Sequence, residues 1–207
     1  MSEGPLGIFG AGGCGRGIMP LARAQYPGRR LVFVEDTPQA GSCNGYQVVA
    51  LSDFAKADGA SIAIAVADPT VRQRIAATCK AAGLGFFDVR AGDTMTMDDV
   101  EIGPGGLVSP FCTFTSNIRV GAHFHCNLYS YVEHDCRIGD FVTFAPSVRC
   151  NGNVTIGDCA FIGCGAMIRQ GVNIGEGATV GMGAVVVADV AAGATVVGNP
   201  ARLLVRR

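Results

Sequence analysis

The 207-residue chain contains no tryptophan, and aromatic residues make up only 7% of it. A core so poor in aromatic rings must be packed with smaller side chains. An excess of charge of one sign is also missing, since 16 lysine and arginine residues face 17 aspartate and glutamate residues. This balance argues against nucleic acid as a partner, which calls for a basic surface. No apolar run approaches the roughly 18 residues that span a bilayer, so no membrane partner is expected.

The cysteines and the first residues also lack the marks of an exported protein. The nine cysteines are an odd number and include no CxxC pair. Residues 1–10 have no basic segment before an apolar stretch, so no secretory signal is expected. Reduced thiols and a cytoplasmic location are the corresponding predictions.

Glycine, in contrast, is abundant at 30 residues, and from Ile102 onward it belongs to a repeat of six. An apolar residue recurs at every sixth position, sixteen times without a slip: Ile102, Val108, Phe114, Val120, Cys126, Val132, Ile138, Phe144, Cys150, Ile156, Ile162, Ile168, Ile174, Val180, Val186 and Ala192. Three hexads close one triangular coil of eighteen residues, and stacked coils bury a continuous core. We therefore expect a parallel β-helix of about five coils, roughly 25 Å tall.

Two companion positions support this register. Glycine often follows the apolar residue and is interpreted as the turn residue. A small residue stands four positions after the apolar one and is interpreted as inward filler: Cys112, Ser130, Cys136, Ala160, Ala166, Ala178 and Ala184.

Residues 1–101 have a different pattern, in which short apolar strands alternate with helical stretches. Strands are expected at 6–9, 31–35, 61–67 and 86–89, and helices at 15–26 and from Pro69 to Gly83. This alternation predicts a small parallel sheet with helices on its faces. The predicted fold is thus an α/β, Rossmann-like domain over 1–101 and an all-β helix over 102–207, with the junction at Gly103–Gly106.

A glycine-rich loop follows the first strand. Gly10, Gly12 and Gly15 match GxGxxG, and Glu35 and Asp36 close the second strand. This order predicts a phosphate at the helix N-terminus and an acid beside a ribose hydroxyl. The alternative is a tight turn that needs glycine only for a positive φ.

Only three histidines are present, and His134 is the candidate general base. It lies between Glu133 and Asp135, and a carboxylate there can orient the ring and support its charge. Gly152, eighteen residues later, has no side chain, so we expect space for a thioester arm beside His134. The alternative is a surface histidine on a turn.

The other two histidines, His123 and His125, precede Cys126 and suggest a zinc site. Cys126 belongs to the inward series, however, so a buried neutral thiol is favoured and no metal is expected. Cys14 lies in the glycine-rich loop at a helix N-terminus, where we expect a lowered thiol pKa.

The hexads, the run VEHDC and the ending IGEGATVGMGAVVVADVAAGATVVGNPARLL together resemble the hexapeptide-repeat acyltransferases. With the loop GAGGCG, the chain resembles more narrowly the NeuD/PglD group of sugar acyltransferases. That resemblance implies a left-handed β-helix and a homotrimer with active sites between neighbouring prisms. It also implies an acyl-CoA donor, expected to be acetyl-CoA, no metal, and a sugar or nucleotide-activated amino sugar as the N- or O-acylated acceptor.

The resemblance also implies roles for individual residues. His134 would be catalytic with Glu133 and Asp135. The acyl-CoA would lie against Asn151, Gly152, Gly163 and Gly181 and against the terminal run Gly198, Asn199, Pro200 and Arg202. Gly12, Gly13, Cys14, Glu35 and Asp36 would hold the nucleotide or sugar of the acceptor.

The chain departs from the group at two positions. Members often carry histidine where this chain has Cys14 and Thr143, so altered contacts to the acceptor and to the acyl donor are expected. Two other functions stay open on the sequence. One is a non-enzymatic trimeric scaffold that binds a nucleotide or metabolite. The other is a zinc lyase resembling γ-carbonic anhydrases. This function is disfavoured because the ligand histidines of those lyases are spread across coils, whereas the histidines of this chain are clustered.

Overall fold

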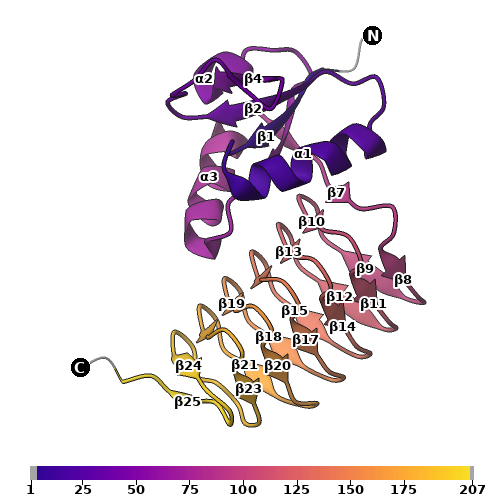
Figure 1. Cartoon of the computed structure of the whole chain (residues 1–207), viewed down its shortest axis with the longest axis vertical. Helices are drawn as coiled ribbons and strands as arrows, with labels where there is room; N and C mark the ends of the chain where they lie inside the picture. The colour runs from indigo at the N-terminus through magenta and orange to yellow at the C-terminus, as the bar shows by residue number, and fades with distance from the viewer. Residues whose placement is uncertain (1–3, 206–207) are drawn as a thin grey trace.

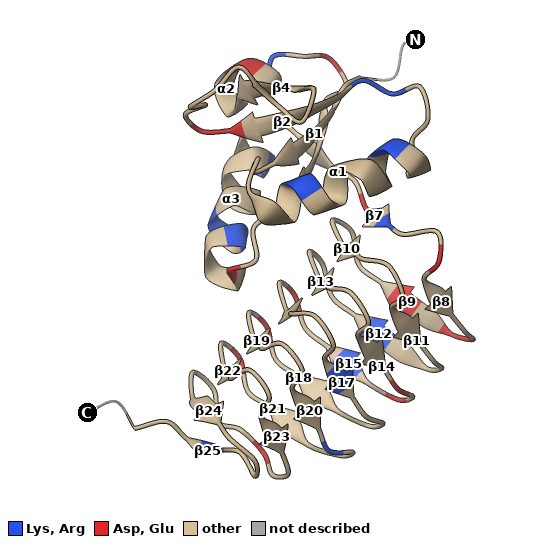
Figure 2. Cartoon of the chain, in the orientation of Figure 1, with Lys and Arg blue, Asp and Glu red and all other residues tan. Residues whose placement is uncertain are grey.

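The computed structural model describes residues 4–205, which form an α/β unit above a three-sided prism (Figure 1). Acidic and basic side chains are scattered over both units (Figure 2). Within the described residues, no helix is long and apolar enough to cross a membrane.

The α/β unit is built on one six-stranded sheet. Its strands are β1 (Leu6–Phe9), β2 (Leu31–Glu35), β3 (Ser42–Cys43), β4 (Tyr46–Ala50), β5 (Ser61–Ile64) and β6 (Gly85–Phe86), and its helices are α1 (Gly13–Gln25), α2 (Leu51–Phe54) and α3 (Pro69–Ala81). The order is β3-β4-β2-β1-β5-β6, with only the β3–β4 pair antiparallel. The predicted parallel sheet is therefore confirmed, while β3, β4 and α2 were not predicted.

Local sequence explains where the helices begin. Asp68 caps α3 by accepting a hydrogen bond from Val71 N at 3.0 Å, and proline occupies the first helical position. In the loop before α1, a Cβ on Gly15 would lie on top of the Gly10 carbonyl oxygen. The last glycine of the motif is thus required for α1 to approach β1 closely.

The prism is formed by three sheets, whose strands are parallel except for the last pair of the first sheet. The first, which we call the covered face, contains β7 (Val89–Arg90), β10 (Leu107–Val108), β13 (His125–Cys126), β16 (Thr143–Phe144), β19 (Phe161–Ile162), β22 (Thr179–Val180), β24 (Thr195–Val197) and β25 (Arg202–Leu203). The second contains β8 (Met95–Thr96), β11 (Thr113–Phe114), β14 (Tyr131–Val132), β17 (Arg149–Cys150), β20 (Met167–Ile168) and β23 (Val185–Val186). The third contains β9 (Val100–Ile102), β12 (Ile118–Val120), β15 (Arg137–Ile138), β18 (Thr155–Ile156) and β21 (Asn173–Ile174).

The eighteen-residue coil is confirmed by the strand register, in which Leu107 pairs with His125 and Thr113 with Tyr131. The prism begins earlier than predicted, because Val89 pairs with Leu107 instead of ending the α/β sheet. The sixfold apolar pattern does not reveal the first coil, because the residues aligned there with the inward series, Arg90 and Thr96, are polar. Both are exposed at the open end of the prism. Gly103–Gly106 is consequently a corner within the prism and not the junction between the units.

The inward series is buried from Val108 through Val186 without exception. Ile102 is half-buried near the open end. The prediction for Ala192 is wrong, because this residue is exposed. The last coil is shortened, with Ile174 opposite Val190 and Thr179 opposite Thr195, so Val190 and Val196 fill the core instead.

The predicted filler positions are confirmed. Cys112, Cys136 and Ala160 are fully buried, and Ser130 is 1% exposed. All nine cysteines are free. These small side chains let the three walls approach closely enough to close the column.

The hexad glycine has a different role from the one predicted. It does not supply the left-handed turn, because positive φ occurs two positions later, as at His123, Phe141 and Cys159 after Gly121, Gly139 and Gly157. The glycine is required by close stacking of the corners: a Cβ on Gly163 would lie 2.6 Å from Met182 N.

Arg72 of α3 joins the two units. Its side chain is 0% exposed, and it donates to the carbonyl oxygens of Val66, Ala67, His123, Phe141 and Val142 and to Thr143 Oγ1, at 2.6–3.3 Å. Burial lowers the pKa of its guanidinium to about 10, so it stays charged at neutral pH. The α/β unit is therefore fixed on the covered face and on the corner that precedes it.

Candidate active site

The corner between the second and third sheets lies opposite the covered face, and we call it the far corner (residues 97–99, 115–117, 133–136 and 151–154). His134 lies here, two residues after the end of β14. Asp135, the next residue, has φ +61, and Asn117 on the preceding coil has φ +58. Aspartate and asparagine tolerate this left-handed conformation better than most residues.

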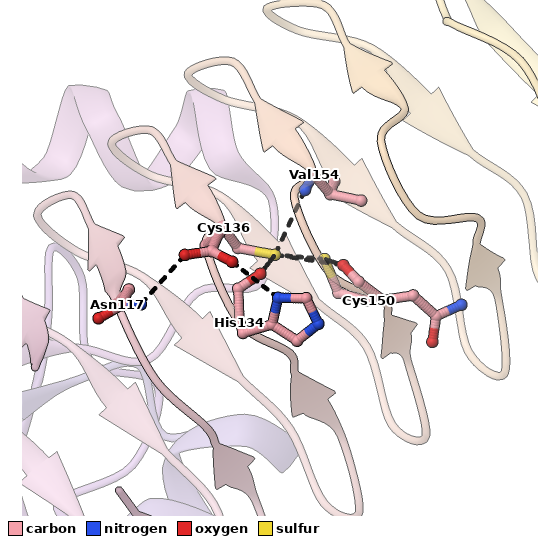
Figure 3. A network of polar contacts seen from close by, with 7 residues as sticks. Asn117, His134, Cys136, Cys150 and Val154 are labelled. Carbon is pink, nitrogen blue, oxygen red and sulfur yellow. Dashed lines mark hydrogen bonds and ion pairs between the residues drawn. The ribbon is translucent and has the colours of Figure 1, made fainter. Parts of the chain in front are cut away.

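A hydrogen-bonded chain runs along the far corner (Figure 3). His134 Nδ1 donates to Asp135 Oδ2 at 2.8 Å, and Asn117 Nδ2 donates to Asp135 Oδ1 at 3.1 Å. A carboxylate only accepts, so Nδ1 carries the proton and the neutral ring has its lone pair on Nε2. The His134 side chain is 52% exposed, which leaves Nε2 open to a substrate.

The neighbouring carboxylates set the protonation of the ring. The hydrogen bond that His134 donates to Asp135 raises the pKa of His134, and the charges of Asp135, Glu133 and Cys136 act in the same direction. The same bond, together with the one from Asn117, lowers the pKa of Asp135. The pair is thus arranged to stabilise a proton arriving at His134.

Gly152 lies beside the imidazole, one coil further on. A Cβ there would be 2.5 Å from Cε1 and 2.7 Å from Nε2 of His134. The prediction that Gly152 leaves space for a thioester arm is wrong in this respect, because the ring itself occupies that space.

Asn151 is held rigidly next to it. Its Nδ2 donates to the Ile168 carbonyl at 2.9 Å, and its Oδ1 accepts from the Tyr131 hydroxyl at 3.0 Å. Behind the turn, the Cys136 thiol donates to the Asn151 carbonyl at 3.2 Å and lies 4.0 Å from Cys150 Sγ (Figure 3). These contacts give the histidine a firm support from the core.

The other residues predicted to bind acyl-CoA do not gather near His134 in one chain. Gly163 and Gly181 follow β19 and β22, so they lie at the corner between the covered face and the second sheet. The turn of Gly198, Asn199 and Pro200 is exposed at the end of the prism. Arg202 is also exposed and donates to its own neighbour's carbonyl, Ala201 O, at 2.9 Å.

The glycine-rich loop lies on the α/β unit, at the carboxyl end of β1. Gly10 has φ +98, and Glu35 Oε1 accepts from Ala11 N at 3.2 Å, which braces the loop. A Cβ on Gly12 or Gly13 would meet no atom within 4 Å. Neither of these two glycines is therefore explained by packing within the chain.

Cys14 differs from its prediction. Burial raises the pKa of its thiol, and the nearby charge of Arg72 opposes this only in part. The helix N-terminus does not outweigh desolvation here, so Cys14 is a poor nucleophile.

Thr143 and His125 lie under the α/β unit. Thr143 is 1% exposed, and its hydroxyl donates to Ala67 O at 2.7 Å. His125 Nε2 donates to Ile64 O at 2.9 Å, and burial holds the pKa of its ring well below the usual value. Thr143 thus contacts Arg72 and Ala67, which follows β5. The predicted alteration of the contacts to the acyl donor stays a prediction, and the buried Thr143 side chain offers no open surface on this chain.

His123 packs between aromatic rings, stacked on Phe141 at 4.8 Å and edge-on to Phe86 at 4.6 Å between ring centroids. Within residues 4–205, no three His, Cys, Asp or Glu side chains cluster as a metal site would require.

Two functional residues escaped the sequence analysis. Asn117 stands eighteen positions before Asp135, so folding the repeat onto itself would have found it. Arg72 left no comparable signal, because its partners are carbonyl groups that any residue type can offer.

Known families match both units of the chain. The PglD N-terminal domain matches residues 5–79, and the bacterial transferase hexapeptide (six repeats) matches residues 153–188. A GDP-perosamine N-acetyltransferase of Escherichia coli O157:H7 is 43% identical over 97% of this chain and 96% of its own length.

Solved structures agree over the full length. WeeI from Acinetobacter baumannii AYE has a TM-score of 0.94 and 46% identity, covering 97% of this chain and 99% of its own. The acetyltransferase domain of PglB from Neisseria gonorrhoeae FA1090, solved in complex with acetyl coenzyme A, has a TM-score of 0.90 and 32% identity, covering 98% and 100%. The left-handed β-helix of these transferases is the fold of this prism as well.

Proposed function

The chain belongs to the hexapeptide-repeat acyltransferases that carry a PglD-type N-terminal domain, and we propose that it acetylates the amino group of a GDP-linked sugar. Membership in this family makes it an acyltransferase with acetyl-CoA as donor. The acceptor is supported by the E. coli relative, whose name specifies a GDP-linked sugar and N-acetylation.

The observation that carries the mechanism is the His134–Asp135 pair with an open Nε2. As the acceptor amine attacks the thioester carbonyl, a C–N bond forms and Nε2 takes the amine proton. The C–S bond then breaks, and the imidazolium returns the proton to the leaving CoA thiolate. Asp135 keeps Nδ1 protonated throughout and stabilises the transient cation.

Acyl-CoA contacts are proposed at two corners of the prism. Asn151 and Gly152 would present backbone groups beside His134, and Gly163 and Gly181 would line the other corner. Arg202 is the proposed cation for the phosphates of CoA, since its exposed guanidinium has no acidic partner in the described residues.

A homotrimer would complete the site. The far corner, which carries His134, lies between the second and third sheets, whereas the α/β unit lies over the covered face (Figure 1). The glycine-rich loop and His134 of one chain are therefore on different sides of the prism. We propose that a neighbouring protomer supplies the loop with Gly12 and Gly13. In this division, the α/β unit holds the acceptor and the prism holds the acyl donor.

The test of the catalytic role is His134→Ala, assayed by CoA thiol release with acetyl-CoA and GDP-perosamine. We expect kcat to fall by about 100- to 10,000-fold, because a positioned base contributes about that much. CoA binding, measured by calorimetry, should be unchanged as a control. Turnover near that of the wild type would contradict the assignment.

Mixed assemblies test the shared site. Gly13→Asp should prevent acceptor binding, because its carboxylate repels the phosphates of the acceptor. The variant should still fold, because an aspartate in the first turn of a helix is stabilising. Each variant alone should be inactive, and mixing unfolded His134→Ala with Gly13→Asp and refolding them together should restore part of the activity. No recovery in assemblies shown to be mixed would exclude a site shared between protomers.

A further inference from the structure

A cleft of about 530 Å³ lies between α3 and the corner of the prism that joins the third sheet to the covered face. One face of α3 forms a wall of this cleft, which we call the joint cleft, with Gln73, Ala76, Ala77 and Lys80. Their spacing of three and four residues places them on one side of the helix. None of the residues proposed above for catalysis or for either substrate lines the joint cleft.

A smaller cleft of about 290 Å³ borders the other side of α3 and includes Asp36 of the predicted acceptor site. Its residues from α3 are Val71, Arg74, Ile75 and Thr78. They are two positions out of step with those of the joint cleft, so they lie about 200° away around the helix. The smaller cleft belongs to the acceptor side already proposed, and the joint cleft is separate from it.

The wall of the joint cleft opposite α3 is aromatic. Phe86 of β6 lies edge-on to the His123 ring and Phe141 stacks on it, with ring centroids 4.6 Å and 4.8 Å away. Leu84 and the two alanines of α3 add only apolar surface. The middle of the cleft is therefore apolar apart from one imidazole.

That imidazole has polar atoms without a partner. His123 is 6% exposed, and its buried Nδ1 forms no hydrogen bond with any residue from 4 to 205. Burial, and after it the charge of Arg72, lowers the pKa of the ring, so the ring is neutral with one N–H donor and one acceptor nitrogen. Because buried polar groups in proteins are almost always paired, the unpaired ring points to a ligand group in the cleft.

The charge of the joint cleft is positive. Among the described residues that line it, Lys80 is the one cation and none is acidic. The Lys80 ammonium takes part in no ion pair or hydrogen bond within residues 4–205. An apolar cleft with one free cation at its edge is complementary to an apolar molecule with one negative charge.

We propose that the joint cleft binds a small apolar carboxylate. The hydrocarbon body lies against Phe86, Phe141 and the alanines of α3. The carboxylate lies between Lys80 and His123, accepting from the ammonium and from the imidazole N–H. This ligand supplies the group that the His123 ring lacks, and the site does not depend on the proposed acetyl transfer.

The position of the cleft links it to the contact between the two units. The carbonyl oxygens of His123 and Phe141 both accept hydrogen bonds from Arg72, which fixes the α/β unit on the prism. A ligand that contacts α3 and this corner together binds the joined arrangement and not the unfolded chain. We therefore expect the carboxylate to raise the unfolding temperature.

The experiment is calorimetric titration of the full-length protein with octanoate and with 2-naphthoate, each compared with its uncharged amide. At least one carboxylate should bind about tenfold more tightly than its amide, as expected for a hydrogen bond to a charged group. The tighter of the two carboxylates tells whether the site prefers an acyl chain or an aromatic ring. In NMR spectra, the ring nitrogens of His123 should shift on binding, while those of His134 stay unchanged.

Two variants at exposed positions of α3 test the site without disturbing the core. Lys80→Met should weaken the carboxylate about tenfold and leave the amide unchanged. Ala77→Phe should abolish binding of both, because the ring fills the cleft. Lys56→Met is the matched control, since this exposed lysine pairs with Asp53 and does not line the cleft.

Four results would each overturn the proposal. They are no binding of either carboxylate at millimolar concentration, equal affinity for carboxylate and amide, unchanged affinity in Lys80→Met, and a shift of the His134 signals in place of those of His123. The last would place the carboxylate at the catalytic site. Because no titration contains acetyl-CoA or a sugar nucleotide, these results are independent of the tests of the proposed function.

Discussion

Asn117 fixes the orientation of the carboxylate that hydrogen-bonds the proposed catalytic base. It occupies one oxygen of Asp135 and leaves the other for His134, so the carboxylate has one orientation. The groups that face the imidazole are Asp135, Glu133 and Cys136, and each raises its pKa. Asn117 therefore acts on the base through Asp135 as a positioning residue.

Asn117→Asp should raise the pKa of His134, because it brings a negative charge to the same carboxylate. A general base must be neutral, so activity rises as the pH increases through the pKa of His134. In Asn117→Asp, this rise in the pH–activity profile should move to higher pH. Asp135→Asn should move it to lower pH. NMR titration isolates His134, since burial lowers the pKa of both other histidines.

Asn44→Asp serves as the control, because Asn44 has a similar left-handed φ of +47 but lies in the β3–β4 turn. An identical His134 titration in Asn117→Asp and in this control would show that Asn117 does not act on the base.

Single residues also show how much of the candidate site could be predicted from the sequence. His134 and its carboxylates were predictable, because a histidine between two acids at a coil corner has few structural uses. The position of its ring over Gly152 was not, since a one-dimensional repeat does not tell which side chain fills a space. The raised pKa of Cys14 was equally hidden, because it depends on burial against a cluster that joins α1 and β1 to Val89 and Leu107 of the prism.

At the level of elements, the corners of the prism depend on two kinds of glycine. One kind stacks against the next coil: a Cβ on Gly157 would lie 2.5 Å from Glu176 N. The other supplies a positive φ in open space, as at Gly177 with φ +63. The first is constrained by neighbouring backbone and the second only by its own conformation.

Gly157→Ala should therefore lower the free energy of unfolding by about 3 kcal/mol, since the backbone must shift to admit the methyl group. Gly177→Ala should cost only about 1 kcal/mol, the usual cost of a left-handed alanine. Urea unfolding of both variants measures the difference. Equal losses would mean that corner stacking is looser than the structure indicates.

The helices and strands differ in how clearly the sequence predicts them. β1 and β2 were predicted with correct bounds because they are short, uniformly apolar and followed by glycine or acid. β3, β4 and α2 were missed, since residues 36–60 mix polar and small residues with no period. The shortened last coil was missed because Ala192 kept the hexad pattern although the backbone had left it.

At the scale of the whole molecule, a buried cation joins the two units, together with the hydrogen bonds of His125 to Ile64 and of Thr143 to Ala67. Arg72 contacts two successive coils and the end of β5 and has only oxygen acceptors from neutral groups around it. Its loss would leave several buried carbonyl groups without a donor. The orientation of the glycine-rich loop on the prism thus depends on a residue remote from the chemistry.

Arg72→Met should lower the free energy of unfolding by about 3 kcal/mol or more, because unpaired buried carbonyl groups are costly. Hydrogen exchange should rise at Ala67 and Thr143, on the two sides of the contact. Arg74→Met, two residues further along α3 and solvent-facing, is the stability control and should be nearly neutral. Matching unfolding curves for both variants would contradict a role of Arg72 in joining the two units.

The tail strand β25 has a consequence for the length of the column. A parallel β-helix has no inherent end, because every finished coil offers a fresh edge on which another chain could grow. β25 returns antiparallel along β24, pairing Val196 with Leu203, and so gives this wall an edge of the opposite polarity. Fibrous end-to-end growth is thereby blocked on one wall by the same strand that carries Arg202.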